Sequence, residues 1–395
     1  MGWDFLRKAD WLDAPRVRGY LLLLATLNLA TLLFLIGTSH AGVDRNGFLL
    51  GTDFLSFWTA GRMLHQGGAV YDAAAHIVAQ RGYFAQPGSY TAFFYPPSFL
   101  LACYPLGFLS YFPALGGWLL ATGAAYLLAV RLWLREAGVT QPLLLLAVAF
   151  PPVWITVAHG QTAFLVAALL GAGAFLVPGR PVLAGICFGL ATIKPQFGVL
   201  VPLVLLLTGE WRVIGAAAAT AVLLGAVSAL AFGPQTWAEW WAISHAAQAA
   251  MNEGSVGFAK MQSPFAAALL LGAPLALAYA VQGLVTGAVV VSLGWVSWRR
   301  RYDLRLASAM LAGAPLTTPF VLDYDLVLLG FPLIALAASA PFRPWEKAAL
   351  AVTFIAAAFA RPLAVNLGIP IMPLVLIAFF IVVLRRALAP VPPRG

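Results

Sequence analysis

Polar side chains that could take part in a reaction lie together in one segment of this chain, directly after its first long apolar stretch. The segment GTDFLSFWTAGRMLHQGGAVYD carries Asp53, Arg62, His65 and Asp72. A carboxylate such as Asp53 can act as a general base that takes a proton from an attacking hydroxyl group. Aspartate is also a favoured N-cap residue, and a helix is predicted to begin near Phe54. Both roles stay open for Asp53, whereas Asp72 is interpreted as a cap and His65 as a structural histidine.

The composition indicates that these residues lie beside a membrane. Hydrophobic residues make up 62% of the 395 positions and charged residues only 9%, whereas soluble proteins carry about 25% charged residues. Apolar runs of about 20 residues, the length that crosses a bilayer, recur from Tyr20 to the C-terminus. We therefore predict an all-α polytopic membrane protein, with about 10–12 transmembrane helices in a single domain over residues 20–388.

The distribution of basic residues predicts the orientation in the membrane. If residues 1–19 are cytoplasmic, most of the 23 lysines and arginines fall in cytoplasmic segments, as the positive-inside rule requires. Both termini, including the tail 389–395, are then cytoplasmic, and the loops 38–92 and 233–263 lie outside the inner (plasma) membrane. The net charge of +9 thus reflects topology and not binding of nucleic acid. The predicted spans are Tyr20–Gly37, Pro113–Leu134, Pro142–Ala158, Gln161–Pro178, Pro181–Ile193, Gln196–Thr208, Val213–Phe232, Leu275–Trp298, Leu304–Leu316, Pro319–Ala338, Lys347–Ala360 and Ile371–Leu384.

Three segments are predicted not to span the membrane in a simple way. Phe93 to Phe112 is apolar but interrupted by prolines, which favours a re-entrant or bent segment buried in protein. Ser263 to Pro274 is interpreted as a similar half-span. Pro234 to Met251 carries tryptophans near helical spacing, which is typical of an interfacial helix at the headgroup level. No cleavable signal peptide is expected within residues 1–19.

The predicted topology places further polar residues at helix breaks on the external side. A charged side chain within an apolar span costs about 2.5–3.5 kcal/mol on insertion scales, so such residues usually face a cavity or a partner. Their convergence on one side predicts a single cavity that opens outward. The residues are His159 and Gln161 in HGQTA, Lys194 and Gln196 in TIKPQFG, Asp323, Tyr324 and Asp325 in LTTPFVLDYD, and Arg361, which is expected to start a later external turn.

An ordered set of sequence blocks resembles glycosyltransferase family 87, a family of membrane enzymes in the GT-C superfamily. The blocks are TDFLSFWTAGRMLHQGGAVYD, FFYPPSFLLACYPL, HGQTAFLVAALL and ATIKPQFGVLVPLVLL. The resemblance implies a GT-C-like fold and transfer of a sugar, often mannose, from a polyprenyl-phosphate-sugar donor to a lipid or glycan acceptor on the external face. Some members carry a Trp- and His-rich block where this chain has TTPFVLDYD.

The resemblance also implies roles for individual residues. By the resemblance, Asp53 is the expected general base of the first external loop. Transfer also needs positive charge beside the leaving lipid phosphate, and Lys194 and Arg361 are the candidates for this role. No cofactor and no divalent metal is expected, although Asp323 and Asp325 could form a carboxylate pair for a cation. The alternative for Lys194 is a side chain that snorkels to the membrane interface. The expected contacts of the sugar or acceptor are Gln161, Gln196, His159, Tyr324 and Asp325.

A membrane transporter or lipid flippase is the alternative function. Such a protein would also place polar residues at helix breaks near the bilayer, and it would usually contain paired repeats. The sequence contains no convincing internal duplication. Movement of a lipid or solute without formation of a glycosidic bond would favour transport.

Overall fold

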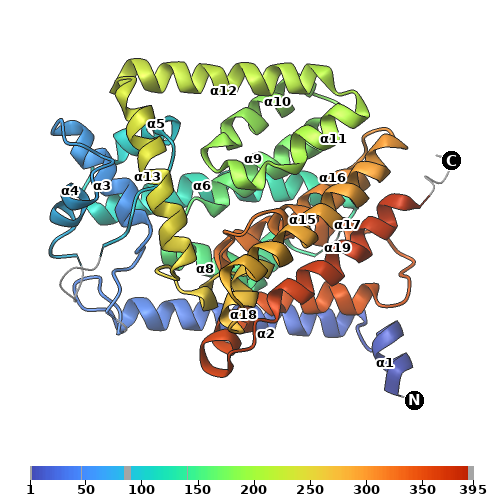
Figure 1. Cartoon of the computed structure of the whole chain (residues 1–395). Helices are drawn as coiled ribbons and strands as arrows, with labels where there is room; N and C mark the ends of the chain where they lie inside the picture. The colour runs from blue at the N-terminus through green and yellow to red at the C-terminus, as the bar shows by residue number, and fades with distance from the viewer. Residues whose placement is uncertain (1, 46, 84–89, 140, 390–395) are drawn as a thin grey trace.

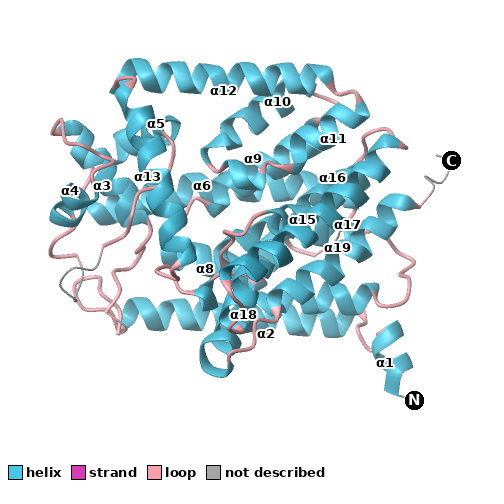
Figure 2. Cartoon of the chain, in the orientation of Figure 1, coloured by secondary structure: helices cyan, strands magenta, loops and turns pink. Residues whose placement is uncertain are grey.

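The computed structural model describes residues 2–45, 47–83, 90–139 and 141–389 of the chain (Figure 1). Within these ranges the regular secondary structure is helical, and β-pairing is confined to isolated bridges (Figure 2). The predicted all-α fold class is therefore confirmed. The predicted tail 389–395 lies, apart from its first residue, outside the described residues.

Five helices of the described chain are long and apolar enough to cross a membrane, which confirms a polytopic membrane protein. Many of their apolar side chains are exposed, above all on α2 and α12. A bilayer would cover these side chains. The five helices are α2 (Ala14–Gly37), α6 (Tyr111–Ala137), α12 (Trp211–Phe232), α15 (Leu275–Trp298) and α18 (Glu346–Leu367), and the slightly shorter α19 (Met372–Leu388) packs against α18.

Several predicted spans are pairs of shorter helices, because proline cannot donate the backbone hydrogen bond of a continuous helix. At the break before Pro151, the carbonyl groups of Val148 and Ala149 instead accept hydrogen bonds from the side chain of Asn28 on α2, at 3.0 and 3.1 Å. The number of membrane crossings stays a prediction. The broken segments are α7 (Leu143–Ala149) with α8 (Pro151–His159); α10 (Pro181–Leu190), η1 (Ala191–Ile193), η2 (Pro195–Phe197) and α11 (Leu200–Thr208); and α16 (Leu304–Gly313), η4 (Ala314–Thr317), η5 (Asp323–Leu329) and α17 (Gly330–Ala337).

The core lies around α16 and η5, in which almost every side chain is buried, and α9 (Ala163–Leu176), in which most are. The polar residues of η5 are therefore embedded in the protein and do not face lipid. This burial explains why they need partners among the side chains of other helices.

Of the remaining short helices, α3 and α4 lie at one end of the bundle, whereas α1 and both termini lie at the opposite end (Figure 1). At the terminal end, Arg300 donates to the carbonyl of Ala389 at 3.0 Å, and Trp345 N donates to the carbonyl of Arg7 at 2.7 Å. The two termini therefore share one end, although the membrane face to which that end corresponds stays a prediction. The short helices are α1 (Gly2–Lys8) near the N-terminus, and α3 (Phe54–His65), α4 (Ala73–Ala79), α5 (Pro97–Leu106), α13 (Gln235–Asn252), η3 (Phe258–Lys260) and α14 (Pro264–Leu270).

A close helix crossing fixes α3 at this end. The segment predicted to be re-entrant contains the ten-residue helix α5, which packs directly on α3, and it leads into the start of α6. A Cβ atom on Gly61 would lie 2.2 Å from the carbonyl oxygen of Cys103, and one on Gly107 would lie 2.5 Å from the backbone of Gly61. Only glycine permits this approach, so the two residues set the position of α3 and of the loop before it.

One sequence prediction about helix bounds is wrong. The span expected to end at Ala360, with Arg361 starting an external turn, continues as α18 to Leu367 and passes through Pro362. The helix ends at Gly368, whose φ of 66° is the left-handed conformation that commonly terminates helices. Arg361 is therefore held on a helix and not on a flexible turn.

Candidate functional site

The loop that carries Asp53 is docked onto the end of α8. Gly51 N donates to the carbonyl of Ala158 at 2.9 Å, and Asp53 N donates to the carbonyl of His159 at 3.1 Å. The next residue, Gly160, has φ 65°, and a Cβ atom there would lie 2.6 Å from Cβ of Phe54. Glycine is required at this position for both reasons. Backbone contacts thus place Asp53 beside His159.

The Asp53 side chain does not cap α3. It makes no capping hydrogen bond, and its backbone is already helical at φ −77°, ψ −29°. Instead, Oδ2 accepts a hydrogen bond from Gln161 Nε2 at 3.0 Å, while Oδ1 lies 3.9 Å from His159 Nδ1. The side chain is 23% exposed, so an outside hydroxyl group can approach it. Asp72, by contrast, accepts from two backbone N–H groups at the start of α4, which confirms its interpretation as a cap.

Gln161 is the centre of a buried hydrogen-bond network. Its Nε2 donates both to Asp53 and to the hydroxyl of Tyr324 (3.1 Å), and its Oε1 accepts from the hydroxyl of Tyr95 (2.8 Å) and from the backbone N of Thr162 (2.7 Å). An amide side chain has two donor hydrogens and two acceptor sites, and all four are in use. Gln161 is 7% exposed and holds the Asp53 carboxylate in this structure, and its expected contact with the sugar or acceptor stays a prediction.

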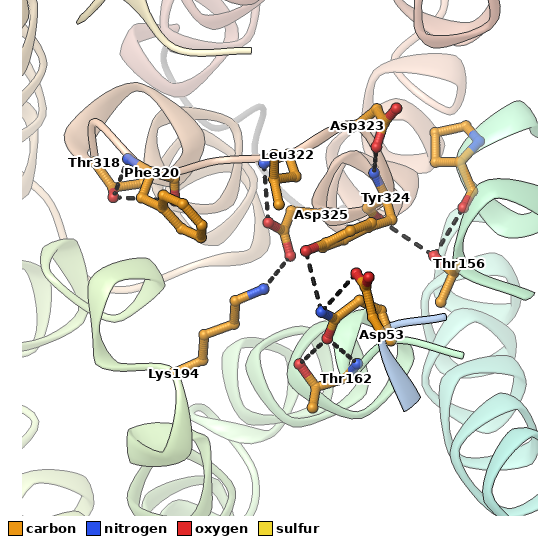
Figure 3. A network of polar contacts seen from close by, with 12 residues as sticks. Asp53, Thr156, Thr162, Lys194, Thr318, Phe320, Leu322, Asp323, Tyr324 and Asp325 are labelled. Atoms are coloured by element: carbon orange, nitrogen blue, oxygen red, sulfur yellow. Dashed lines mark hydrogen bonds and ion pairs between the residues drawn. The ribbon is translucent and has the colours of Figure 1, made fainter. Parts of the chain in front are cut away.

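Lys194 and Asp325 form a buried ion pair behind this network. Lys194 lies between η1 and η2, and its Nζ donates to Asp325 Oδ1 at 2.5 Å, with 4% and 3% of the two side chains exposed. The same Nζ lies 5.2 Å from the ring centre of Tyr324, within range of a cation–π interaction. Figure 3 shows this pair on one side of Tyr324 and Asp53 on the other. The expected phosphate partner Lys194 and the expected sugar contact Asp325 are thus bound to each other.

A second ion pair lies closer to the surface. Arg361 NH1 lies 3.7 Å from Asp323 Oδ2, and the arginine side chain is 33% exposed. Asp323 also accepts from the backbone N of Tyr324 at 3.0 Å. Because Asp323 and Asp325 contact different cations, they are not arranged as a shared ligand pair for one ion. The guanidinium group of Arg361 has five donor hydrogens, so it keeps capacity for a further anion.

Lys260 also lies at this site, although no role was predicted for it from the sequence. A Met261–Leu322 bridge and a 2.8 Å hydrogen bond from Gln262 N to the carbonyl of Val321 hold η3 against the chain before η5. Burial lowers the pKa of Lys260 and the charge of Arg361 lowers it further, whereas Asp53 and Asp323 act in the opposite direction. A sequence signal was available, since Lys260 is the one lysine or arginine within residues 233–263.

Other polar residues that the sequence singled out lie outside the network. Gln196, on η2, is half-buried and makes no hydrogen bond with the site residues that the structure describes. His65 packs between the rings of Tyr104 and Phe108, at centroid distances of 4.5 and 4.1 Å. Arg62 lies over the Trp58 ring at 5.5 Å. His65 is therefore a structural residue, as predicted.

Fold and site together define a multi-pass membrane protein that gathers a partly exposed carboxylate and two partly exposed cations at one end of its helix bundle. The family model of glycosyltransferase family 87 matches residues 93–322, more than half of the chain. The chain therefore belongs to glycosyltransferase family 87 and is a membrane glycosyltransferase. Among the site residues, Gln161, Lys194 and Lys260 lie within the match, while Asp53 and Arg361 lie outside it. Comparisons with curated proteins and with solved structures give no match.

Proposed function

We propose that the protein transfers a sugar from a polyprenyl-phosphate-sugar donor to a lipid or glycan acceptor on the external face of the plasma membrane, with Asp53 as the general base. Mannose or another hexose or a pentose is the proposed sugar. The observation that carries the proposal is the state of Asp53. One carboxylate oxygen is held by Gln161 at 3.0 Å, while the side chain stays partly exposed beside His159 and makes no capping bond.

In the proposed reaction, Asp53 takes the proton of the acceptor hydroxyl as the hydroxyl oxygen attacks the anomeric carbon of the sugar. The new bond joins that carbon to the acceptor oxygen, and the bond from the carbon to the phosphate oxygen breaks. The electron pair stays on the leaving lipid phosphate, whose growing negative charge needs cations or hydrogen-bond donors. His159 and Tyr324 are proposed to line the acceptor side, because both lie next to Asp53 or its partner Gln161.

The proposed phosphate partners are Arg361 and Lys260. Arg361 is partly exposed and only loosely paired with Asp323 at 3.7 Å, and the ammonium group of Lys260 lies within electrostatic reach of Arg361. Lys194 was expected to share this role. We now propose that Lys194 instead neutralises Asp325 and supports Tyr324, because a contact with phosphate would require it to leave a 2.5 Å buried ion pair. Gln196, next to this pair on η2, remains a proposed sugar contact.

The function is tested with purified protein, a panel of polyprenyl-phosphate sugars and a membrane lipid extract, with products detected by mass spectrometry. Asp53→Asn keeps an acceptor for Gln161 but removes the basicity, so turnover is expected to fall by about 10²-fold or more. Asp72→Asn is the matched control in the same loop, since asparagine caps about as well as aspartate. A folded Asp53→Asn protein with near wild-type turnover would falsify the assignment. Movement of a lipid without a new glycosidic bond would instead support the transporter.

The phosphate assignment is tested with Lys260→Gln and Arg361→Gln. Donor affinity is expected to fall in both variants, with acceptor affinity changed less. Arg62→Gln is the control, because Arg62 is a cation at the same end of the bundle that stacks on Trp58. Unchanged donor affinity in both variants would contradict the assignment of Lys260 and Arg361 to the donor phosphate. A selective loss of donor affinity in a folded Lys194 variant would instead support Lys194 as the phosphate partner.

The proposed orientation, with both termini in the cytoplasm, is tested by labelling single cysteines from each side of the membrane. Ser255 follows α13 and Ser339 follows α17, and the native Cys103 and Cys187 are replaced by alanine. Label that reaches Ser255→Cys from outside and Ser339→Cys only from inside is expected. Labelling of both from one side contradicts the orientation.

A further inference from the structure

A groove of about 400 Å³ lies between α6, α9 and α10, away from the candidate site. Its walls are apolar and include Leu132 of α6, Leu169 of α9 and Cys187 of α10. The sequence explains the hollow, since Ala125 and Ala129 on α6 and the alanines at 168 and 172 on α9 are spaced four residues apart and line the same groove. Small side chains on facing helices leave a trough where larger ones would interlock.

The groove runs towards the end of the bundle that carries the two termini. Helices α6 and α9 run in the same direction, since Trp118 Nε1 donates to the carbonyl of Gly160 just before α9 at 3.0 Å and Trp133 Nε1 donates to the carbonyl of Gly171 at 2.9 Å. The end of α9 is fixed there by Tyr302, whose hydroxyl donates to the carbonyl of Ala174 at 3.0 Å. The segment after α15 that carries Tyr302 also contacts Ala389, through Arg300. The last turns of α6 therefore lie at the terminal end.

Two arginines close the groove at this end. Arg131 and Arg135 line it, are exposed, and lie one helical turn apart on the same face of α6. Neither forms an ion pair with another described residue, whereas Arg300 and Arg386 at the same end pair with Asp303 and Glu346. An apolar trough that ends in two unpaired cations is complementary to a molecule with an apolar chain and an anionic head.

We propose that this groove binds one anionic phospholipid, with its phosphate on Arg131 and Arg135 and an acyl chain in the trough between α6, α9 and α10. Charge complementarity commits the site to an anionic headgroup, and the continuous apolar wall favours a lipid over free phosphate. Basic residues at helix ends also follow from the positive-inside rule, but that rule does not require a groove beneath them. The site is independent of the proposed reaction.

Binding is measured on delipidated full-length protein in neutral detergent, by native mass spectrometry and thermal shift with phosphatidylglycerol, phosphatidylcholine and inorganic phosphate. Phosphatidylglycerol is expected to bind roughly tenfold or more tightly than phosphatidylcholine. The double variant Arg131→Gln/Arg135→Gln should lose this preference. Arg180→Gln/Arg212→Gln should keep it, because those arginines are exposed and do not line the groove.

A second variant tests the trough without touching the charges. Ala125→Phe fills the apolar part of the groove and should weaken binding of phosphatidylglycerol while both arginines remain. Equal binding of the two phospholipids by the wild-type protein, or an equal loss in both double variants, would overturn the proposal. Inorganic phosphate that stabilises the protein as much as the lipid would show a simple anion site and would also overturn it.

Discussion

Replacing Lys194 by methionine tests whether the Lys194–Asp325 pair holds the site together. The two side chains are 4% and 3% exposed, and the Nζ–Oδ1 distance is 2.5 Å. In Lys194→Met, the Asp325 carboxylate keeps a single hydrogen bond, from Leu322 N at 3.1 Å, and becomes an uncompensated buried charge. Removal of one partner of such a pair costs about 3–5 kcal/mol, so we expect the free energy of unfolding to fall by this amount. Asp325→Asn, which leaves the lysine unpaired, should lose a similar amount.

The double variant Lys194→Met/Asp325→Asn gives the sharper test. It contains no unpaired charge, and the asparagine oxygen can still accept from Leu322. The remaining cost is a buried amide group without a partner, about 1–3 kcal/mol. Because the single substitutions would add to about 6–10 kcal/mol if they were independent, the double-mutant cycle should give a coupling free energy of at least about 3 kcal/mol.

Reversible unfolding in mixed micelles measures these free energies, and donor binding is measured on the folded fraction. The ion-pair interpretation predicts that both single variants lose stability and that the double variant regains most of it. A direct phosphate role for Lys194 predicts a stable Lys194→Met protein with weak donor binding and an Asp325→Asn protein with normal binding. Two stable single variants with additive effects would refute the structural interpretation.

Three further predictions follow from the geometry. Gln161→Ala removes a donor to the charged Asp53 carboxylate, a hydrogen bond of about 1.5–3 kcal/mol, so steady-state kinetics should show turnover reduced about 10–100-fold with KM little changed. Gly160→Ala should destabilise the protein by more than about 1 kcal/mol, measured by unfolding, because its Cβ would meet Phe54 at 2.6 Å. Burial lowers the pKa of His76 from 6.5 to about 4, so the unfolded segment binds a proton at a higher pH than the folded one. The stability of α4 should therefore be complete above about pH 6.5 and should fall by up to about 3 kcal/mol towards pH 4. Hydrogen-exchange protection of residues 73–79 measures this change.

Each of these predictions has a control. Gln248→Ala removes an exposed amide on α13 that has no proposed role, and it should leave turnover nearly unchanged. Gly138→Ala has a similar positive φ of 61° but open space around its Cβ, so it should cost less than Gly160→Ala. His76→Asn should abolish the pH dependence of protection in α4. A control variant with the same effect as the variant that it accompanies would contradict the argument for that residue. Hydrogen-exchange protection of α4 that stays constant from pH 7 to pH 4 would contradict the argument for His76.

The sequence determined the class of protein and much of the arrangement of its polar residues. Long apolar runs and scarce charge required a helical membrane protein, because only hydrogen-bonded helices or closed barrels satisfy the backbone in lipid. The helix break at Pro195 was predicted, because proline cannot donate the backbone hydrogen bond of a continuous helix, whereas the break before Pro151 lies within a span predicted as continuous. The cap at Asp72 was predicted from local chemistry alone. The end of α18 was not, because a helix can pass through Pro362 and stop only at Gly368.

Tertiary structure alone decided which polar residues are partners. Asp53 and Gln161 are 108 positions apart, and Lys194 and Asp325 are 131 apart. Nothing in the residue types indicates that the amide orients the carboxylate, or that the lysine is neutralised while Lys260 and Arg361 remain partly exposed. Those roles depend on which buried groups the packing of α8, α9 and η5 brings within hydrogen-bonding distance. Burial makes every unpaired polar group costly, so the partners are selected by three-dimensional proximity, which the local sequence pattern does not encode.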